Sequence, residues 1–344
     1  MKHLIAILLI MSVCLSMLAG CGNAAAGTPD ASTLTSETTE PTQPGEEGKR
    51  LKILTLGNSG SLNCTHLLAH IAALEGYENF DVATLYYSGC SLAAHVNFLT
   101  QDTPDYWLYE SSTDTPNVVP NILQSVSMKQ ALRYDYWDIV VMQGNSWEMA
   151  GNDANIRKNI QTIQNYIWEN CKNPNAKIVW HMGWVAPTDN TLRDTYSADP
   201  AKNVYRTRYA PYNDDRNALY QAFVKSTQEN VVPDEVFRYL IPTGTAMENA
   251  LTSYLEEKDI HRDYYHATDL AYVMLSYVWL CRIFGIEQLS EIKLDKVPVA
   301  FFKSTMGSQD LVLTDTEKAI ILEAVNNALK DPFTVTQSQY TVAP

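Results

Sequence analysis

The sequence predicts an α/β fold, a three-layer α/β/α domain around a mostly parallel sheet of about five strands. Short apolar runs that end at glycine or proline alternate along the chain with longer segments of helical periodicity. The runs are almost continuously apolar, as are strands that helices cover on both faces. The chain has 344 residues, enough for one large core, and we expect residues 51–344 to form this domain.

The expected elements follow in chain order. The strands are expected at 51–56, 80–87, 137–142, 176–182 and 235–241, and the helices at 62–74, 156–168, 213–228, 246–256 and 268–284. A last helix is expected after Thr314, because Thr314 and Glu317 have the spacing of a capping box. Two insertions, 97–128 and 185–211, adjoin the edge of the sheet where ligands bind in such folds, so we expect them to form walls of a site.

The N-terminal segment has the pattern of an export signal. One lysine precedes the apolar run 4–18, which is short for a membrane-spanning helix, and small residues lead to Cys21. We interpret residues 1–20 as a lipoprotein signal peptide and Cys21, by its resemblance to a bacterial lipobox, as the lipidated residue. The alternative is an ordinary secretory signal. Residues 21–50 are rich in Ser, Thr, Pro, Gly and Glu, which predicts a disordered tether. We therefore expect an exported bacterial protein that is lipid-anchored to the outer face of the membrane.

The charge and the cysteines limit the partners. The chain has 25 Lys and Arg against 39 Asp and Glu, a net charge of −14, and loss of Lys2 with the signal changes this to 24 − 39 = −15. Such acidity argues against nucleic acid and against a membrane contact other than the lipid anchor. The cysteines after Cys21 are Cys64, Cys90, Cys171 and Cys281. Their spacing matches no zinc pattern and leaves three disulfide connectivities open. The sequence predicts no particular oligomeric state.

Three side chains have the chemistry of a hydrolytic triad. Ser59 follows the first strand in Gly57-Asn58-Ser59, where a nucleophile is exposed at the edge of a sheet. Asp263 and His266 lie three residues apart after the last expected strand. A serine needs a histidine as base, and the histidine needs a carboxylate to orient it. Because the carboxyl ends of parallel strands meet at one edge, we expect the three side chains to come together. The plainer interpretation is a capping turn and a surface Asp-His pair.

These motifs resemble the first and last blocks of the SGNH (GDSL-like) hydrolases, and more narrowly an uncharacterised SGNH-like family of exported bacterial proteins. The resemblance extends over residues 51–285 and rests on the segments 53–59, 88–92, 138–143, 178–182 and 241–246. It implies a flavodoxin-like order of strands and a serine esterase that needs no cofactor and no metal. In it Ser59 attacks the ester, His266 transfers the proton and Asp263 orients His266.

The resemblance also implies an oxyanion hole that contains the backbone N–H groups of Ser59 and Gly89. The third block of these enzymes usually supplies an asparagine amide, but here the strand ends Gln143-Gly144-Asn145-Ser146. Either Gln143 or Asn145 can supply the third donor, since both carry an amide N–H. Gly60 is a second departure, because the narrower family has a bulky residue there.

The expected substrate is an acyl ester, most simply an acetyl group on a carbohydrate. Trp147, His181 and Trp184 lie at or just past strand ends and are expected to bind it. A metal site formed by His261, Asp263, His266 and His181 is an alternative, but the triad uses the same residues without a metal. The rival class is a glycan- or ligand-binding lipoprotein that keeps the fold without catalysis, which the irregular third block favours.

Overall fold

The computed structural model describes residues 49–298, 301 and 309–343. The strands of the main sheet are β1 (Leu51–Gly57), β2 (Phe80–Tyr86), β3 (Tyr106–Ser112), β4 (Asn121–Val126), β5 (Ile139–Met142), β6 (Lys177–His181) and β7 (Phe237–Ile241). β8 (Lys296–Val297) and β9 (Leu311–Val312) form a separate antiparallel pair. The expected signal peptide, Cys21 and nearly all of the expected tether lie outside the described residues.

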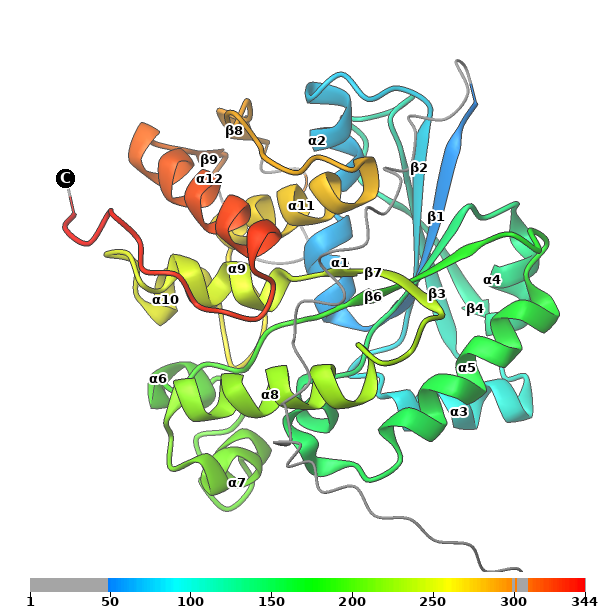
Figure 1. The fold of residues 1–344 in the computed structure, drawn as a ribbon, viewed down its shortest axis with the longest axis horizontal. Helices are drawn as coiled ribbons and strands as arrows, with labels where there is room; N and C mark the ends of the chain where they lie inside the picture. Colours follow the sequence, from blue (N-terminus) through cyan, green and yellow to red (C-terminus); the bar gives the residue numbers. More distant parts are fainter. Residues whose placement is uncertain (1–48, 299–300, 302–308, 344) are drawn as a thin grey trace, which may run out of the picture. The chain divides into compact units, whose positions relative to one another are not determined.

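The helices that surround the sheet are shown in Figure 1. They are α1 (Ser59–Thr65), α2 (Leu68–Leu74), α3 (Leu92–Gln101), α4 (Met128–Tyr134), α5 (Ile156–Asn170), α6 (Asn190–Arg193), α7 (Val204–Tyr209), α8 (Arg216–Asn230), α9 (Thr243–Ala250), α10 (Glu257–Ile260), α11 (Asp269–Phe284) and α12 (Asp315–Lys330), with a π-helical turn η2 (Glu148–Asn152) and a 3-10 turn η3 (Ala210–Tyr212). None of the helices in the described ranges has the length and apolarity needed to cross a membrane.

The sheet confirms the expected fold class. Its strand order is β4-β3-β2-β1-β5-β6-β7, and β2, β1, β5, β6 and β7 run parallel to one another. This is the flavodoxin-like arrangement, with one crossover helix or more between successive parallel strands. The capping box before α12 is also present, with Thr314 and Glu317 each bonded to the backbone of the other.

The sheet is larger than the five strands that the sequence predicts. The insertion 97–128 contains β3 and β4, an antiparallel hairpin that extends the sheet beyond β2. β4 is an edge strand with mostly exposed residues, so it lacks the apolar pattern by which the buried strands are recognised. Only pairing with β3 makes this segment a strand, and pairing is a tertiary property.

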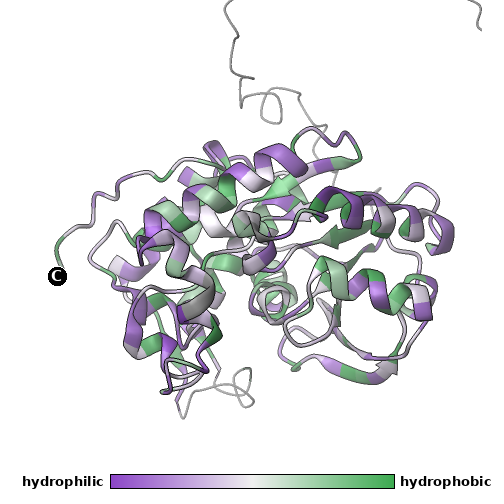
Figure 2. Cartoon of the chain, turned by 90° about the horizontal axis from the view of Figure 1, so that it is seen from below, coloured by the Kyte–Doolittle hydropathy of each residue, from purple (hydrophilic) through white to green (hydrophobic). Residues whose placement is uncertain are grey.

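Two hydrophobic cores, one on each face of the sheet, hold the layers together. Successive residues of a strand point to opposite faces, so Ile53 belongs to the core under α2, α9, α11 and α12, whereas Leu54 belongs to the core under α3, α5 and α8. Figure 2 shows the same arrangement, with largely hydrophobic strands at the centre and helices that carry hydrophilic stripes. The two cores leave the carboxyl ends of the parallel strands as the edge at which the candidate residues gather.

The last residue of the expected tether contacts the sheet. Arg50, placed in the tether by composition, forms ion pairs with Asp81 and Asp114. The predicted helix at 62–74 is two helices, and the first of them, α1, begins at Ser59. Ser59 therefore lies in the first turn of a helix directly after β1.

Candidate active site

The turn that presents Ser59 is fixed by the side chain of Asn58. Its Oδ1 accepts a hydrogen bond from the Gly60 N–H (2.8 Å), and its Nδ2 donates to the Cys90 carbonyl (2.9 Å). One side chain thus ties the turn after β1 to the turn after β2. Gly57 is required at the end of β1, because a Cβ there would lie 2.0 Å from Ser61 Oγ.

Gly89 occupies an exposed turn after β2. Its φ of +61° lies in the left-handed region that favours glycine, and the turn closes with a bond from Cys90 N to the Tyr87 carbonyl (3.1 Å). In the part of the chain that the structure describes, the Gly89 N–H makes no hydrogen bond. Its amide is therefore an unused donor on the turn that Asn58 holds.

Asp263 and His266 form a pair in the loop between α10 and α11. His266 Nδ1 lies 2.9 Å from both carboxylate oxygens of Asp263. Asp263 also accepts the backbone N–H groups of Tyr265 (3.0 Å) and His266 (2.8 Å), and Arg262 Nε lies 3.1 Å away. Burial alone would raise the pKa of Asp263, but the bonds from His266 and from the backbone outweigh it and hold this pKa well below its usual value. The carboxylate stays charged and His266 Nε2 is the nitrogen left for other partners.

This loop is held against α1 by Asn63. Asn63 Oδ1 accepts the Ala267 N–H (2.9 Å), and its Nδ2 lies 2.6 Å from the Tyr272 hydroxyl. Asn63 is fully enclosed, and it is four residues after Ser59, on the same side of the helix. The sequence analysis missed it, although a polar residue on a buried helix face is a signal that could have found it.

The insertion 185–211 holds the other side of the loop. Trp184, just before it, donates Nε1–H to the Tyr265 carbonyl (2.9 Å) and stacks on the Tyr265 ring at 5.4 Å. Within the insertion, Thr195 Oγ1 accepts the Tyr264 N–H (3.0 Å). The insertion thus lies beside the Asp263–His266 pair, where the sequence predicted a wall of the site.

The Ser59 turn and the Asp263–His266 loop are in contact. A Cβ at Gly60 would lie 2.8 Å from the Tyr265 hydroxyl, so the loop fills the space that a bulky residue would need. This contact explains the glycine at position 60. Among the described residues, however, no hydrogen bond joins Ser59 to His266, although both are partly exposed. In unliganded sites such bonds are often long and tighten when substrate binds.

The third block places its two amides differently. Gln143 is buried, and its Cδ would lie 3.2 Å from a Cβ at Gly57, so it packs beneath the Ser59 turn. Its Oε1 is 2.8 Å from His181 Nδ1, while its Nε2 is buried without a partner. Asn145 is instead partly exposed, and its Oδ1 accepts the N–H of Glu148, the first residue of η2 (2.9 Å). Of the two amides, Gln143 is the one that contacts the nucleophile turn.

The three expected substrate-binding residues lie at different depths. Trp147 is partly exposed and packs edge-on against Tyr209. His181 and Trp184 are each 1 % exposed, because Gln143 and Tyr265 lie against them. This burial corrects the expected substrate contact of both residues, since they support the site from beneath. Burial lowers the pKa of His181 to about 3.

The alternative metal site is not assembled. His261 Nε2 lies 3.1 Å from the guanidinium of Arg216, which itself pairs with Glu248 and Glu257. Within residues 49–298, 301 and 309–343, no three His, Cys, Asp or Glu side chains are grouped to hold a metal ion. In the same ranges the cysteines are free: Cys64, Cys90, Cys171 and Cys281.

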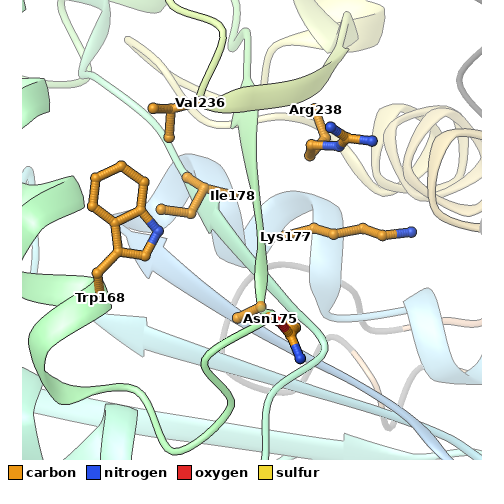
Figure 3. Close-up of a pocket in the computed structure, with 7 residues that line it drawn as sticks. Trp168, Asn175, Lys177, Ile178, Val236 and Arg238 are labelled. Carbon is orange, nitrogen blue, oxygen red and sulfur yellow. The ribbon is translucent and has the colours of Figure 1, made fainter.

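A pocket of about 290 Å³ lies at the other end of the sheet. Trp168, Lys177, Ile178 and Arg238 are among the residues that line it (Figure 3). These residues are near the amino ends of β6 and β7, whereas the residues described above follow the carboxyl ends of the strands. This pocket is therefore distinct from the candidate active site.

The fold and the site define a flavodoxin-like α/β/α domain with a serine and an Asp-His pair at the carboxyl edge of its sheet. The chain belongs to the DUF4886 family, a domain of unknown function, which matches residues 52–300. The crystal structure of a DUF4886 family protein from Bacteroides uniformis shares the fold, with a TM-score of 0.66 and 20% identity over 84% of this chain and 98% of that one.

A second solved structure, from Slackia heliotrinireducens, is of a protein whose description proposes an SGNH hydrolase. It aligns with a TM-score of 0.40 and 17% identity over 68% of this chain and 99% of that one, which is too distant to bear on function. A search of curated proteins found no match.

Proposed function

We propose that this protein is a serine ester hydrolase with Ser59 as nucleophile, His266 as base and Asp263 as the residue that orients His266. The observation that carries the proposal is the Asp263–His266 pair, with Nδ1 of the imidazole 2.9 Å from the carboxylate oxygens. The carboxylate accepts a hydrogen bond from Nδ1–H and keeps the proton on that nitrogen, so Nε2 is the nitrogen that accepts the Ser59 proton during attack and returns it to the leaving alcohol. Water then hydrolyses the acyl-enzyme by the same proton transfers.

The oxyanion hole in this proposal contains the N–H groups of Ser59 and Gly89 and the amide of Gln143. Asn58 supports the first two, because it joins their turns. Gln143 is favoured over Asn145, because its side chain packs against Gly57 and its buried Nε2 makes no hydrogen bond, while the Asn145 side chain is bonded to the Glu148 N–H. Such donors stabilise the negative charge that develops on the ester oxygen.

Covalent labelling tests the triad directly. A fluorophosphonate reacts with a hydroxyl that a base activates and an oxyanion hole supports. We expect a single adduct on Ser59, no adduct in Ser59→Ala or His266→Ala, and slower labelling in Asp263→Asn. Ser197→Ala, which changes a partly exposed serine of the neighbouring insertion, should label like wild type. An adduct on another serine, or turnover that survives Ser59→Ala, would contradict the assignment.

The proposed substrate is an acetylated carbohydrate outside the cell. The expected export signal agrees with this substrate, and a cluster of three tyrosines supports it: the Tyr264 ring lies 5.5 Å from the His266 ring, and Tyr196 and Tyr205 lie 5.1 and 4.7 Å from Tyr264. Tyr196→Ala should raise KM for acetylated xylo-oligosaccharides and leave KM for p-nitrophenyl acetate unchanged. Equal effects on both esters would remove the carbohydrate from the proposal.

The proposed location is the outer face of the membrane, with Cys21 as the lipid anchor. Cys21→Ala should abolish lipid labelling and release the protein from the membrane fraction. If this variant still sediments with membranes as wild type does, the anchor is elsewhere.

Two observations favour the rival function, a binding lipoprotein without catalysis. Ser59 and His266 are not hydrogen-bonded in the described structure, and the Gln143 nitrogen is closed to solvent. A folded protein that takes no fluorophosphonate and hydrolyses no ester, but binds acetylated glycans, would identify that function.

A further inference from the structure

The hairpin of β3 and β4 brings a second group of aromatic side chains to the carboxyl edge of the sheet. Tyr86 ends β2, and Trp107 lies directly opposite it near the start of β3, with ring centroids 6.4 Å apart. The Tyr109 ring lies 5.6 Å from the Tyr86 ring and 6.4 Å from the Trp107 ring. These three rings form one group, which we name the hairpin cluster.

The hairpin cluster lies on the face of the sheet that α1 covers. Thr84 is two residues before Tyr86, and its hydroxyl oxygen lies 2.8 Å from that of Thr65 in α1. Side chains two residues apart in a strand point to the same face, so Tyr86 shares this face. Tyr86 is also the register partner of Gly57, about 4.8 Å away across the sheet, and Ser59 begins α1 two residues later. The cluster is therefore beside the nucleophile turn.

The rings of the hairpin cluster are open to solvent. Trp107 is 42 % exposed, and Tyr86 and Tyr109 are partly exposed. Cross-strand pairing explains why the rings contact one another, but it does not explain why three neighbouring aromatic side chains remain accessible to water. A contiguous exposed group of this kind marks an interaction surface, and its position next to a candidate active site points to the substrate.

Tyr264 connects the hairpin cluster to the tyrosines of the insertion 185–211. Burial is the main cause of the raised pKa of Tyr264, followed by the charge of Asp263, and the nearby hydroxyls of Tyr196 and Tyr86 raise it further. Tyr264 is thus close both to Tyr196 of the insertion and to Tyr86 at the end of β2. Its own ring lies edge-on to the His266 ring at 5.5 Å. Aromatic side chains from two distant parts of the chain therefore gather around the proposed base.

We propose that the hairpin cluster binds sugar rings of a carbohydrate chain whose ester group lies at Ser59, while Tyr196 and Tyr205 bind another part of the same chain. The substrate is then an oligosaccharide or polysaccharide that carries esters along its length. Sugar rings present C–H groups that pack on aromatic faces, and the tyrosine hydroxyls can bond to sugar hydroxyls. The inference rests on the proposed esterase function for the position of the ester, but binding of the chain can be measured without turnover.

The first test measures binding by calorimetry in full-chain Ser59→Ala, which cannot turn the ester over. Acetylated xylohexaose should bind at least about tenfold more tightly than acetylated xylobiose, because only the longer chain reaches both groups of rings. Adding Trp107→Ala should raise Kd for the hexaose about three- to tenfold, the effect of one aromatic contact, and leave Kd for the biose unchanged. Trp107→Phe should retain most of the binding. Trp168→Ala is the matched control, because Trp168 is 50 % exposed but lies at the opposite end of the sheet, and it should change neither Kd.

The second test measures turnover in the protein that retains Ser59. Trp107→Ala should raise KM for acetylated xylohexaose about three- to tenfold and leave kcat unchanged, because the ring binds the chain and does not touch the reacting atoms. The kinetics with p-nitrophenyl acetate should stay as in wild type, since this ester is too small to reach the hairpin cluster. Loss of kcat with both esters would mean that Trp107 only supports the fold, and the proposed sugar site would be wrong.

The outcomes separate this proposal from the esterase function. Equal Kd values for the two chain lengths, or a Kd for the hexaose that Trp107→Ala does not change, would overturn the sugar site whether or not the protein hydrolyses esters. Dimerisation in sedimentation experiments that Trp107→Ala abolishes, with hexaose binding unchanged, would instead assign the rings to a second copy of the chain. A protein that binds the hexaose through Trp107 but hydrolyses no ester would contradict the esterase function and leave the sugar site established.

Discussion

Asn63 offers the sharpest test of how the fold assembles the candidate triad. It joins α1, which begins with Ser59, to the loop that carries Asp263 and His266. Asn63→Leu keeps the branched shape but strands the Ala267 N–H, which costs about 1–3 kcal/mol, and removes the bond to Tyr272, worth about 1 kcal/mol. We therefore expect the free energy of unfolding to fall by about 2–4 kcal/mol. Because the loop loses its register on α1, kcat for p-nitrophenyl acetate should fall at least about a hundredfold, as it does for displacements near 1 Å.

The matched control is Thr65→Val on the same helix. Thr65 is equally buried and bonds Ser61 and Thr84, so its loss also destabilises the protein, by about 1–3 kcal/mol, but it does not touch the loop. Urea unfolding gives the stability of both variants, and turnover under folded conditions gives kcat. If Asn63→Leu turns over as fast as Thr65→Val once both are folded, the proposed positioning role of Asn63 is refuted.

Three further predictions concern the nucleophile turn and the residues beneath it. Gln143→Met should lower kcat by about 10²–10³ with little change in KM. Asn145→Ala should lower the free energy of unfolding by about 1 kcal/mol, because the bond to the Glu148 N–H is lost, and should change kcat little. The reverse result would make Asn145 the donor. Gly60→Ala should lower both kcat and the free energy of unfolding, the latter by about 1–3 kcal/mol, because its Cβ would lie 2.8 Å from the Tyr265 hydroxyl; calorimetry showing wild-type stability would exclude the clash. Burial lowers the pKa of His181 to about 3 in the folded protein, whereas its pKa in the unfolded chain is about 6.5. Below pH 6.5 the unfolded chain therefore binds a proton that the folded chain does not. The contribution of His181 to the free energy of unfolding should fall by about 2 kcal/mol from pH 8 to pH 5. His181→Asn should lack this part of the pH dependence, and identical pH profiles in urea unfolding would contradict it.

The sequence by itself determined the parts of the molecule that depend on neighbouring residues. The five parallel strands were predictable, because strands buried on both faces leave continuous apolar runs. The capping box of Thr314 and Glu317 was predictable, because its two bonds span only three residues. The Asp263–His266 pair was predictable for the same reason, since residues three apart in one loop can meet without help from the rest of the chain.

The tertiary structure alone decided what depends on residues that are distant in sequence. β4 is a strand only because β3 pairs with it, and its exposed residues carry no apolar pattern. The sequence left Gln143 and Asn145 equivalent as amide donors. Gln143 packs beneath Gly57, whereas Asn145 is bonded to the Glu148 N–H, and these contacts distinguish them. The sequence analysis expected His181 to contact substrate, but the convergence of strand ends buries its side chain. Each of these outcomes follows from which strands lie side by side, a property that no local pattern of residues contains.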